Sequence, residues 1–227
     1  SISDTGMHGD IANGTLHISK SLDGPWELLE NGNGGKLNAS GGEGFNLSNI
    51  SITVRQDGTY EATNRNGDIA IADSLAGVWE VKENGLWWKI PGMSSENIED
   101  PVIWYSDGLY HIIVNKWDAR MAYYLTSEDG ITNWKRHPGM AYAPDTDFLR
   151  YEDGTVNDWT KLERPNVYVE DGKVKAMTFA VIDVQKEEDF GNDAHGSKII
   201  VVPLSSEKLQ NLDSQPDPLD KREGILP

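Results

Sequence analysis

Short apolar runs interrupted by Asp-Gly dipeptides recur along the chain, and no sustained apolar period of 3.6 residues is present. Three such stretches cover residues 50–60, 101–110 and 165–174. Asp-Gly supplies the positive φ angles that a tight turn between two twisted strands requires. Each stretch therefore predicts a β-hairpin. The chain as a whole is expected to be nearly all β, with few and short helices.

A second motif recurs, in which a strand carries a small polar residue into a Gly-containing turn that is followed by a Trp. The tryptophans are Trp26, Trp79 and Trp134, spaced 53 and 55 residues apart. Because they recur at one position of a repeat, we expect them to pack within the repeat and not to contact a ligand. Two hairpins in roughly fifty residues make four strands per period, which is typical of a β-propeller blade.

The repeat predicts a β-propeller domain of the five-bladed type over residues 1–204, with about three and a half blades in the chain. The expected parts are the closing half of a blade with a linker at 1–43, blades at 44–92, 93–158 and 159–204, and a polar tail at 205–227. Propellers typically close with about four to eight blades. Upstream sequence, a partner chain or oligomer, or an unusual closure is therefore expected to complete the ring.

Candidate functional residues follow from the repeat, because the innermost strand of a propeller blade starts at one mouth of the central channel. Counting back eight residues from each Asp-Gly aspartate gives Asn49, Glu99 and Glu163. Further residues are expected at the same mouth, among them Asn115 at the end of a second strand, and Asp100, His111, Trp117, Arg120, Arg164, His8 and His195.

Paired carboxylates in a central pocket suit hydrolysis of a glycosidic bond, in which one carboxyl protonates the leaving oxygen and another activates water. Burial and like-charge proximity would raise one of the two pKa values, as a general acid requires. Glu99, Glu163 and His195 are the candidate catalytic residues. The candidate substrate-binding residues are Asn49, Asp100, His111, Trp117, Arg120, Arg164 and His8, with Trp117 placed to stack on a sugar ring.

Structural roles remain open for several of these residues. Glu163 and Arg164 could form an ion pair that closes a blade. Asp100, which precedes Pro101, could accept hydrogen bonds from backbone N–H groups in a strand-entry turn. For His195, local hydrogen bonding is as reasonable as a catalytic role.

Composition excludes several classes of function. With 37 acidic and 20 basic residues the net charge is −17, which argues against a nucleic acid or an anionic membrane surface as partner. No run of apolar residues is long enough to predict a membrane span. The absence of Cys excludes disulfides, thiolate zinc sites and cysteine nucleophiles. No cofactor is expected, although the channel could hold a structural calcium ion or another cation.

The segments 97–114, 122–134 and 162–183 resemble bacterial five-bladed β-propeller glycoside hydrolases, namely family 43 and its neighbours such as family 117. The resemblance covers roughly residues 8–204 and implies a secreted or periplasmic bacterial enzyme acting on a poly- or oligosaccharide. In family 43 the glutamate of a Glu-small-Pro motif that starts a blade is the general acid, and Glu99 matches that place. In family 117-like enzymes a His is the acid, a role that would fall here to His195 or His111.

The chain departs from family 43 in two ways. The aspartate that tunes the acid, at the start of an earlier blade, is replaced by Asn49 or Ser51. The family's catalytic base lies on the first blade, which the blade count does not find here. Two alternatives therefore remain beside hydrolysis: a propeller that binds carbohydrate without cleaving it, or an inactive truncated hydrolase; and a polysaccharide lyase, with His or Tyr as base and Arg neutralising a uronate.

Overall fold

The computed structural model describes residues 2–3, 15–21, 23–40, 45, 47–93, 96–144, 149–189 and 196–204. These residues form β-strands and short 3₁₀ helices, and none of the described ranges contains an α-helix. The 3₁₀ helices are η2 (Leu86–Lys89), η3 (Trp117–Ala119) and η4 (Lys186–Glu188). The all-β prediction is confirmed. The chain divides into two compact units, Ser1–Lys89 and Ile90–Pro227, each with an apolar core of its own.

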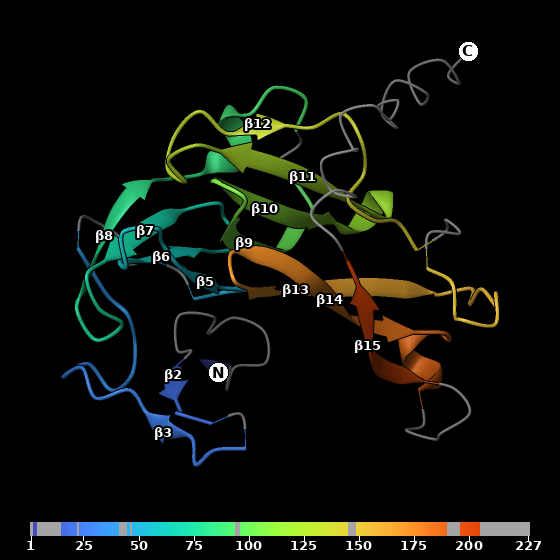
Figure 1. Ribbon diagram of the computed structural model, residues 1–227, viewed down its shortest axis with the longest axis horizontal. Coiled ribbons are helices and arrows are strands. Elements are labelled where there is room, and N and C mark those ends of the chain that lie inside the picture. The colour runs from blue at the N-terminus through green and yellow to red at the C-terminus, as the bar shows by residue number, and fades with distance from the viewer. Residues whose placement is uncertain are drawn as a thin grey trace. The chain divides into compact units, whose positions relative to one another are not determined.

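The first unit contains two sheets (Figure 1). One is three-stranded, with the order β1 (Ile2–Ser3), β2 (Thr15–Ile18) and β3 (Glu27–Leu28). The other has the order β4-β8-β7-β6-β5, from β4 (Asn38–Ser40), β5 (Ser51–Val54), β6 (Tyr60–Thr63), β7 (Ile69–Ala72) and β8 (Val78–Glu83). Strands β5 to β8 are antiparallel and fall within the predicted blade 44–92. Strand β4 comes from the segment 1–43 and pairs in parallel with β8, an addition that the repeat did not predict.

The repeat tryptophans do not share one environment. Trp79, on β8, is 0% exposed in the core of the first unit, and Trp134, in the second unit, is 7% exposed. Packing within the repeat is therefore confirmed for these two. For Trp26 the prediction is wrong, since its side chain is 46% exposed. Strand β3, which follows Trp26, is two residues long with both side chains exposed, so this sheet has little surface to cover the ring.

The second unit also contains two sheets (Figure 1). Four antiparallel strands have the order β12-β11-β10-β9, from β9 (Ile98–Ser106), β10 (Leu109–Lys116), β11 (Met121–Ser127) and β12 (Lys135–Arg136). Three more have the order β13 (Lys161–Glu170), β14 (Lys173–Ile182) and β15 (Ser197–Pro203). Side chains from both sheets share one core, in which Trp104 and Tyr124 belong to the same buried cluster as Phe179. This shared core holds β9 and β13 in fixed positions.

The three predicted hairpins are confirmed, with two kinds of turn. Strand β9 turns into β10 through Asp107 and Gly108, whose φ angles are 50° and 85°, and β13 turns into β14 through Asp171 and Gly172 at 51° and 71°. Positive φ at both central residues is the signature of the type I′ turn. The turn from β5 to β6 is longer, because the Gly58 amide donates to the Arg55 carbonyl and the Arg55 amide to the Thr59 carbonyl.

Candidate active site

Strands β9 and β13 carry the same irregularity at the same step. Between Glu99 and Val102, two residues of β9 face the single residue Val114 of β10. Likewise, between Glu163 and Asn166, two residues of β13 face the single residue of β14 at position 179. Each is a β-bulge, and in each the second inserted residue is a proline, which has no N–H to offer the ladder.

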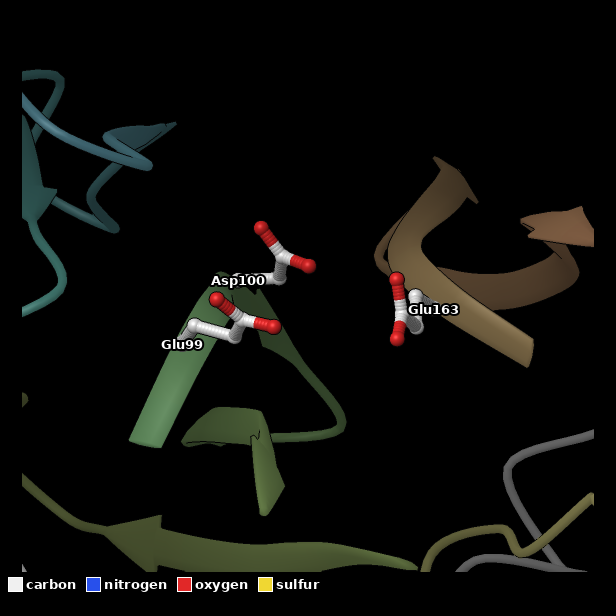
Figure 2. Close-up of side chains that lie close together, drawn as sticks. All are labelled: Glu99, Asp100 and Glu163. Atoms are coloured by element: carbon white, nitrogen blue, oxygen red, sulfur yellow. The ribbon is translucent and has the colours of Figure 1, made fainter. Parts of the chain in front are cut away.

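The first inserted residue of each bulge has a left-handed backbone. Asp100 has φ 52° and Arg164 has φ 51°, and neither is glycine. A conformation of this kind costs on the order of 1–3 kcal/mol and tends to be found at functional sites. At each bulge the left-handed backbone interrupts the regular alternation of side chains between the two faces of the sheet. Figure 2 shows the carboxylates of both Glu99 and Asp100 turned toward Glu163 on β13.

The bulges bring three acidic side chains together. Glu99, Asp100 and Glu163 each offer a carboxylate oxygen, and these oxygens all lie within 4.8 Å of one another. Asp100 is the most buried, at 7% exposed, while Glu99 and Glu163 are partly exposed. The structure thus joins the two candidate catalytic glutamates, and it adds an aspartate that the sequence indicated only as a substrate-binding residue.

Burial is the main cause of an unusual pKa at Asp100, which is raised from 3.8 to about 6. The charges of Glu99 and Glu163 raise the pKa further. The Arg164 charge opposes them, and the Arg164 backbone N–H donates a hydrogen bond to the Asp100 carboxylate. At pH 6 this carboxyl is therefore about half protonated, whereas an ordinary Asp is almost fully ionised.

Glu163 has a cationic neighbour of its own. Lys161 Nζ lies 3.1 Å from Glu163 Oε1 and donates to it, and the Glu163 side chain is 17% exposed. Arg164 is exposed, and its part at the cluster is the contact with Asp100. In the structure the cation that pairs with Glu163 is Lys161. The structural alternative, an ion pair between Glu163 and Arg164 that closes a blade, stays a prediction.

Two further polar side chains, those of Tyr142 and Asn115, face the same cluster. Tyr142 is 2% exposed, and burial followed by the charges of Asp100, Glu163 and Glu99 raises its pKa well above the usual value. Asn115 is also 2% exposed and lies directly opposite Glu99 in the ladder between β10 and β9. No described residue accepts a hydrogen bond from Tyr142 Oη or Asn115 Nδ2. Tyr142 stands at no repeat position, so the sequence offered no signal for it, whereas the repeat already predicted Asn115 at the channel mouth.

His111 is not brought to the cluster. It lies opposite Trp104, four residues along β10 from Asn115, which is about 13 Å in a strand. Its Nδ1 lies 2.8 Å from Tyr124 Oη and its Nε2 lies 3.0 Å from the Ser106 carbonyl oxygen. Burial lowers the pKa of His111, so the ring is neutral, with Nε2–H donating to Ser106 and Nδ1 accepting from Tyr124. These contacts indicate a structural histidine.

Trp117 and Arg120 follow β10, and their contacts are structural. Trp117 is 45% exposed on η3, and its backbone amide donates to the Asn97 carbonyl. Arg120 is exposed and donates to the carbonyls of Thr160 and Trp159, at 2.5 and 3.2 Å, just before β13 begins. It therefore clamps the segment that leads to Glu163. A role for either residue in binding a sugar stays a prediction.

For three candidates the structure gives no position relative to the cluster. Asn49 belongs to the first unit, with φ 48° and a buried Oδ1 that accepts no hydrogen bond from any described residue. His8 and His195 lie outside the described residues. The predictions that place these three at the mouth of a channel stay predictions.

The carboxylate cluster could also hold a cation. Its donor set is made of oxygens alone, which is the preference of Ca²⁺ and Mg²⁺. The residues present thus fit the structural calcium or other cation that the sequence allowed for. The same three carboxylates have chemistry of their own without a metal, because one of them retains a proton near neutral pH.

No protein-family model matches the chain, and no curated protein matches it. Solved structures do. Arb43A, a native arabinanase of Bacillus subtilis, matches with a TM-score of 0.51 at 13% identity, covering 86% of this chain and 65% of that one. An endo-arabinanase of glycoside hydrolase family 43 from Bacillus licheniformis gives 0.45 at 15% identity, covering 73% and 57%. A thermostable family-43 glycoside hydrolase gives 0.49 at 15%, covering 84% and 62%.

The chain has a β-propeller type of fold. The match to the B. subtilis arabinanase carries this statement, and with it the predicted fold class is confirmed. The likeness is one of fold, and the number of blades stays a prediction. The chain spans less than two thirds of the length of each of the three structures. Among the described residues, no helix is long and apolar enough to cross a membrane.

Proposed function

We propose that the chain is a glycoside hydrolase in which Glu99, Asp100 and Glu163 act together on the glycosidic bond. The observation that carries this proposal is the pKa of about 6 at Asp100, inside a group of three carboxyls within 4.8 Å of one another. Cleavage of a glycosidic bond needs one carboxyl that protonates the leaving oxygen and a second carboxylate that acts as base or nucleophile. The cluster meets that need near neutral pH.

The burial of the three residues suggests how the work is divided. Asp100 lies deepest and holds a proton below about pH 6. Glu99 and Glu163 are more exposed and are the groups that reach the substrate, with Glu99 keeping the acid role that the family resemblance implies. Because one carboxylate oxygen of each residue lies within 4.8 Å of the others, the proton of Asp100 can pass to Glu99, which delivers it to the leaving oxygen as the bond breaks.

The spacing of the carboxylates limits the stereochemistry. An inverting glycosidase keeps its two carboxyls about 6.5–9.5 Å apart to admit water, and a retaining one about 5–5.5 Å apart. In this cluster one oxygen of each carboxylate lies within 4.8 Å of the others, which is closer than the spacing that admits a water. An inverting reaction would therefore need a base from outside the three residues. The anomeric form of the first product, followed by NMR, distinguishes the two outcomes.

The substrate class in this proposal is a plant polysaccharide or its oligosaccharides. The B. subtilis neighbour is named as an arabinanase, so arabinan is the first substrate to try. Action on such polymers implies a secreted or periplasmic enzyme, and this location is part of the proposal.

Glu99→Gln and Glu163→Gln are expected to lower kcat/KM on arabino-oligosaccharides by on the order of 10²–10⁴-fold. Only the variant that has lost the proton donor should recover on 2,4-dinitrophenyl glycosides, because that leaving group needs no protonation. The measurement is kcat/KM of both variants on both kinds of substrate. Hydrolysis of the oligosaccharides at the parent rate by both variants would exclude the cluster as the acid.

The pH dependence of hydrolysis should reflect the raised pKa of the cluster. The protonated form is required, so activity is expected below about pH 6 and should fall about tenfold per pH unit above it. A pH profile of kcat/KM from pH 4 to 9 measures this limb. With a 2,4-dinitrophenyl glycoside the alkaline fall should disappear, and a fall that persists would assign the limb to another group.

Carbohydrate binding without cleavage is the second candidate function, and Asn49 is the observation that favours it. An amide stands at the strand start where the resemblance to family 43 leads one to expect a carboxylate. A protein that binds arabino- or xylo-oligosaccharides, yet releases no reducing ends from them, would favour this candidate over hydrolysis.

A further inference from the structure

We propose that Tyr142 Oη and Asn115 Nδ2 are hydrogen-bond donors to a bound saccharide, and that together with the carboxylate cluster they form one sugar-binding subsite. The inference deepens the proposed function and rests on it for the class of ligand. It assigns a binding role to Tyr142, for which the repeat gave no signal, and to Asn115, for which the repeat predicted a place at the mouth and no role.

The position of Tyr142 is fixed by its backbone and ring. Its carbonyl accepts from the Ala122 amide at 3.0 Å, and the Ala141 amide donates to the Ala122 carbonyl at 2.9 Å, so this loop is held against β11. Its ring packs edge-on against Phe179, with 5.0 Å between centroids. The hydroxyl end lies in the field of all three carboxylates. The side chain is thus held in the core with its polar end directed at the cluster.

The hydroxyl nevertheless makes no hydrogen bond to any described residue. A buried hydroxyl with no partner is uncommon in folded proteins and destabilises them. Tyr124, another buried tyrosine of the same unit, shows the ordinary solution, because its hydroxyl lies 2.8 Å from His111 Nδ1. Phenylalanine would fill the place of Tyr142 at lower cost. The retained hydroxyl therefore points to a ligand.

Asn115 repeats the pattern on the neighbouring strand. It lies opposite Glu99, and directly opposite residues of an antiparallel pair project from the same face. Its Nδ2 is buried and has no acceptor among the described residues. The second donor group therefore stands beside the first carboxylate of the cluster.

The combination suits a polyhydroxylated ligand. A sugar hydroxyl both donates and accepts, so one hydroxyl can accept from Tyr142 or Asn115 while it donates to a carboxylate. Three carboxylates alone would favour a cation, and the two donors have no role in binding a cation. Donors and acceptors side by side indicate neighbouring hydroxyls of a sugar ring.

The test compares Tyr142→Phe with Tyr124→Phe in the full chain. The ligands are sulfur-linked arabino- and xylo-oligosaccharides, which resist hydrolysis, and the readouts are Kd by calorimetry and the melting temperature. Tyr142→Phe is expected to raise Kd about 3- to 10-fold and to raise the melting temperature by about 2–4 °C. Tyr124→Phe should lower the melting temperature and leave Kd unchanged. Asn115→Leu should raise Kd as Tyr142→Phe does.

Three results would overturn the subsite: an unchanged Kd in Tyr142→Phe, a lower melting temperature in Tyr142→Phe, or a parent protein that binds none of these oligosaccharides. Its failure can be told from failure of the proposed function. Hydrolysis of oxygen-linked oligosaccharides with equal kinetics in the parent and Tyr142→Phe would remove the subsite and leave the hydrolase. Binding that depends on Tyr142, without any hydrolysis, would remove the hydrolase and leave the subsite.

Discussion

Asp100→Asn is expected to abolish hydrolysis while making the protein more stable at pH 7. The loss should be on the order of 10²–10⁴-fold in kcat, because the amide cannot hold the proton of the cluster. The gain follows from the pKa, which folding raises from 3.8 to about 6, a shift equivalent to about 3 kcal/mol. Folding is therefore opposed by this carboxylate wherever it is ionised, and the neutral amide removes that opposition.

The sign of the pH dependence makes the stability prediction specific. Between about pH 4 and 6 the folded protein binds the Asp100 proton and the unfolded chain releases it, so this group lowers the free energy of unfolding as pH rises. Asp100→Asn should therefore exceed the parent by roughly 1–3 kcal/mol at pH 7 and by little at pH 4. Urea titrations at both pH values measure the difference.

Asp153→Asn is the matched control for Asp100→Asn. Asp153 is exposed, and its pKa is lowered by hydrogen bonds from Thr155, including one from the Thr155 amide at 2.8 Å. The control should show the opposite sign, a slightly lower urea midpoint at pH 7, with hydrolysis unchanged. If Asp100→Asn were less stable than the parent at pH 7, burial of the Asp100 charge could not be what opposes folding.

Trp79→Ala is expected to destabilise the first unit by about 3–5 kcal/mol, the cost of removing a large buried aromatic side chain. Trp79 is 0% exposed, and its Nε1 donates to the Leu75 carbonyl at 3.3 Å. A free energy of unfolding measured by urea denaturation, with tryptophan fluorescence and circular dichroism followed together, would record the change.

The equivalent repeat residue provides the control. Trp26 is 46% exposed, so Trp26→Ala should cost less than about 1 kcal/mol. The repeat alone would predict equal effects for the two tryptophans, whereas their burial predicts a large difference. Equal losses of stability would show that Trp26 is covered to the same extent as Trp79.

Much of this fold could be predicted from the sequence because its turns carry local information. A type I′ turn requires positive φ at both central residues, which Asp-Gly tolerates, and Asp107-Gly108 and Asp171-Gly172 both form this turn. Strand β4 could not be predicted, because parallel pairing with β8 depends on distant chain segments and has no local signature. The exposure of Trp26 could not be predicted for the same reason, since burial depends on which distant segments pack against a residue.

The repeat was sufficient to predict the two glutamates of the candidate site. Counting from the turns found Glu99 and Glu163, because the strands β9 and β13 have equal lengths between bulge and turn. The sequence could not predict that Asp100 has the raised pKa, since the shift results mainly from burial. Tyr142 comes from a loop that follows β12, and only tertiary structure brings its hydroxyl near the carboxylates.

The paired bulges have a consequence for how the gene can change in length. Side chains of a strand alternate between faces, so loss of one residue from a strand exchanges the faces of everything on one side of the deletion. Deleting Asp100 would restore a regular ladder and turn Glu99 away from Glu163, although every other residue of β9 remained. Loop tips such as Asp107-Gly108 have no such constraint. Insertions and deletions among descendants of this sequence should therefore occur at the hairpin turns and not within the Glu-x-Pro segments 99–101 and 163–165.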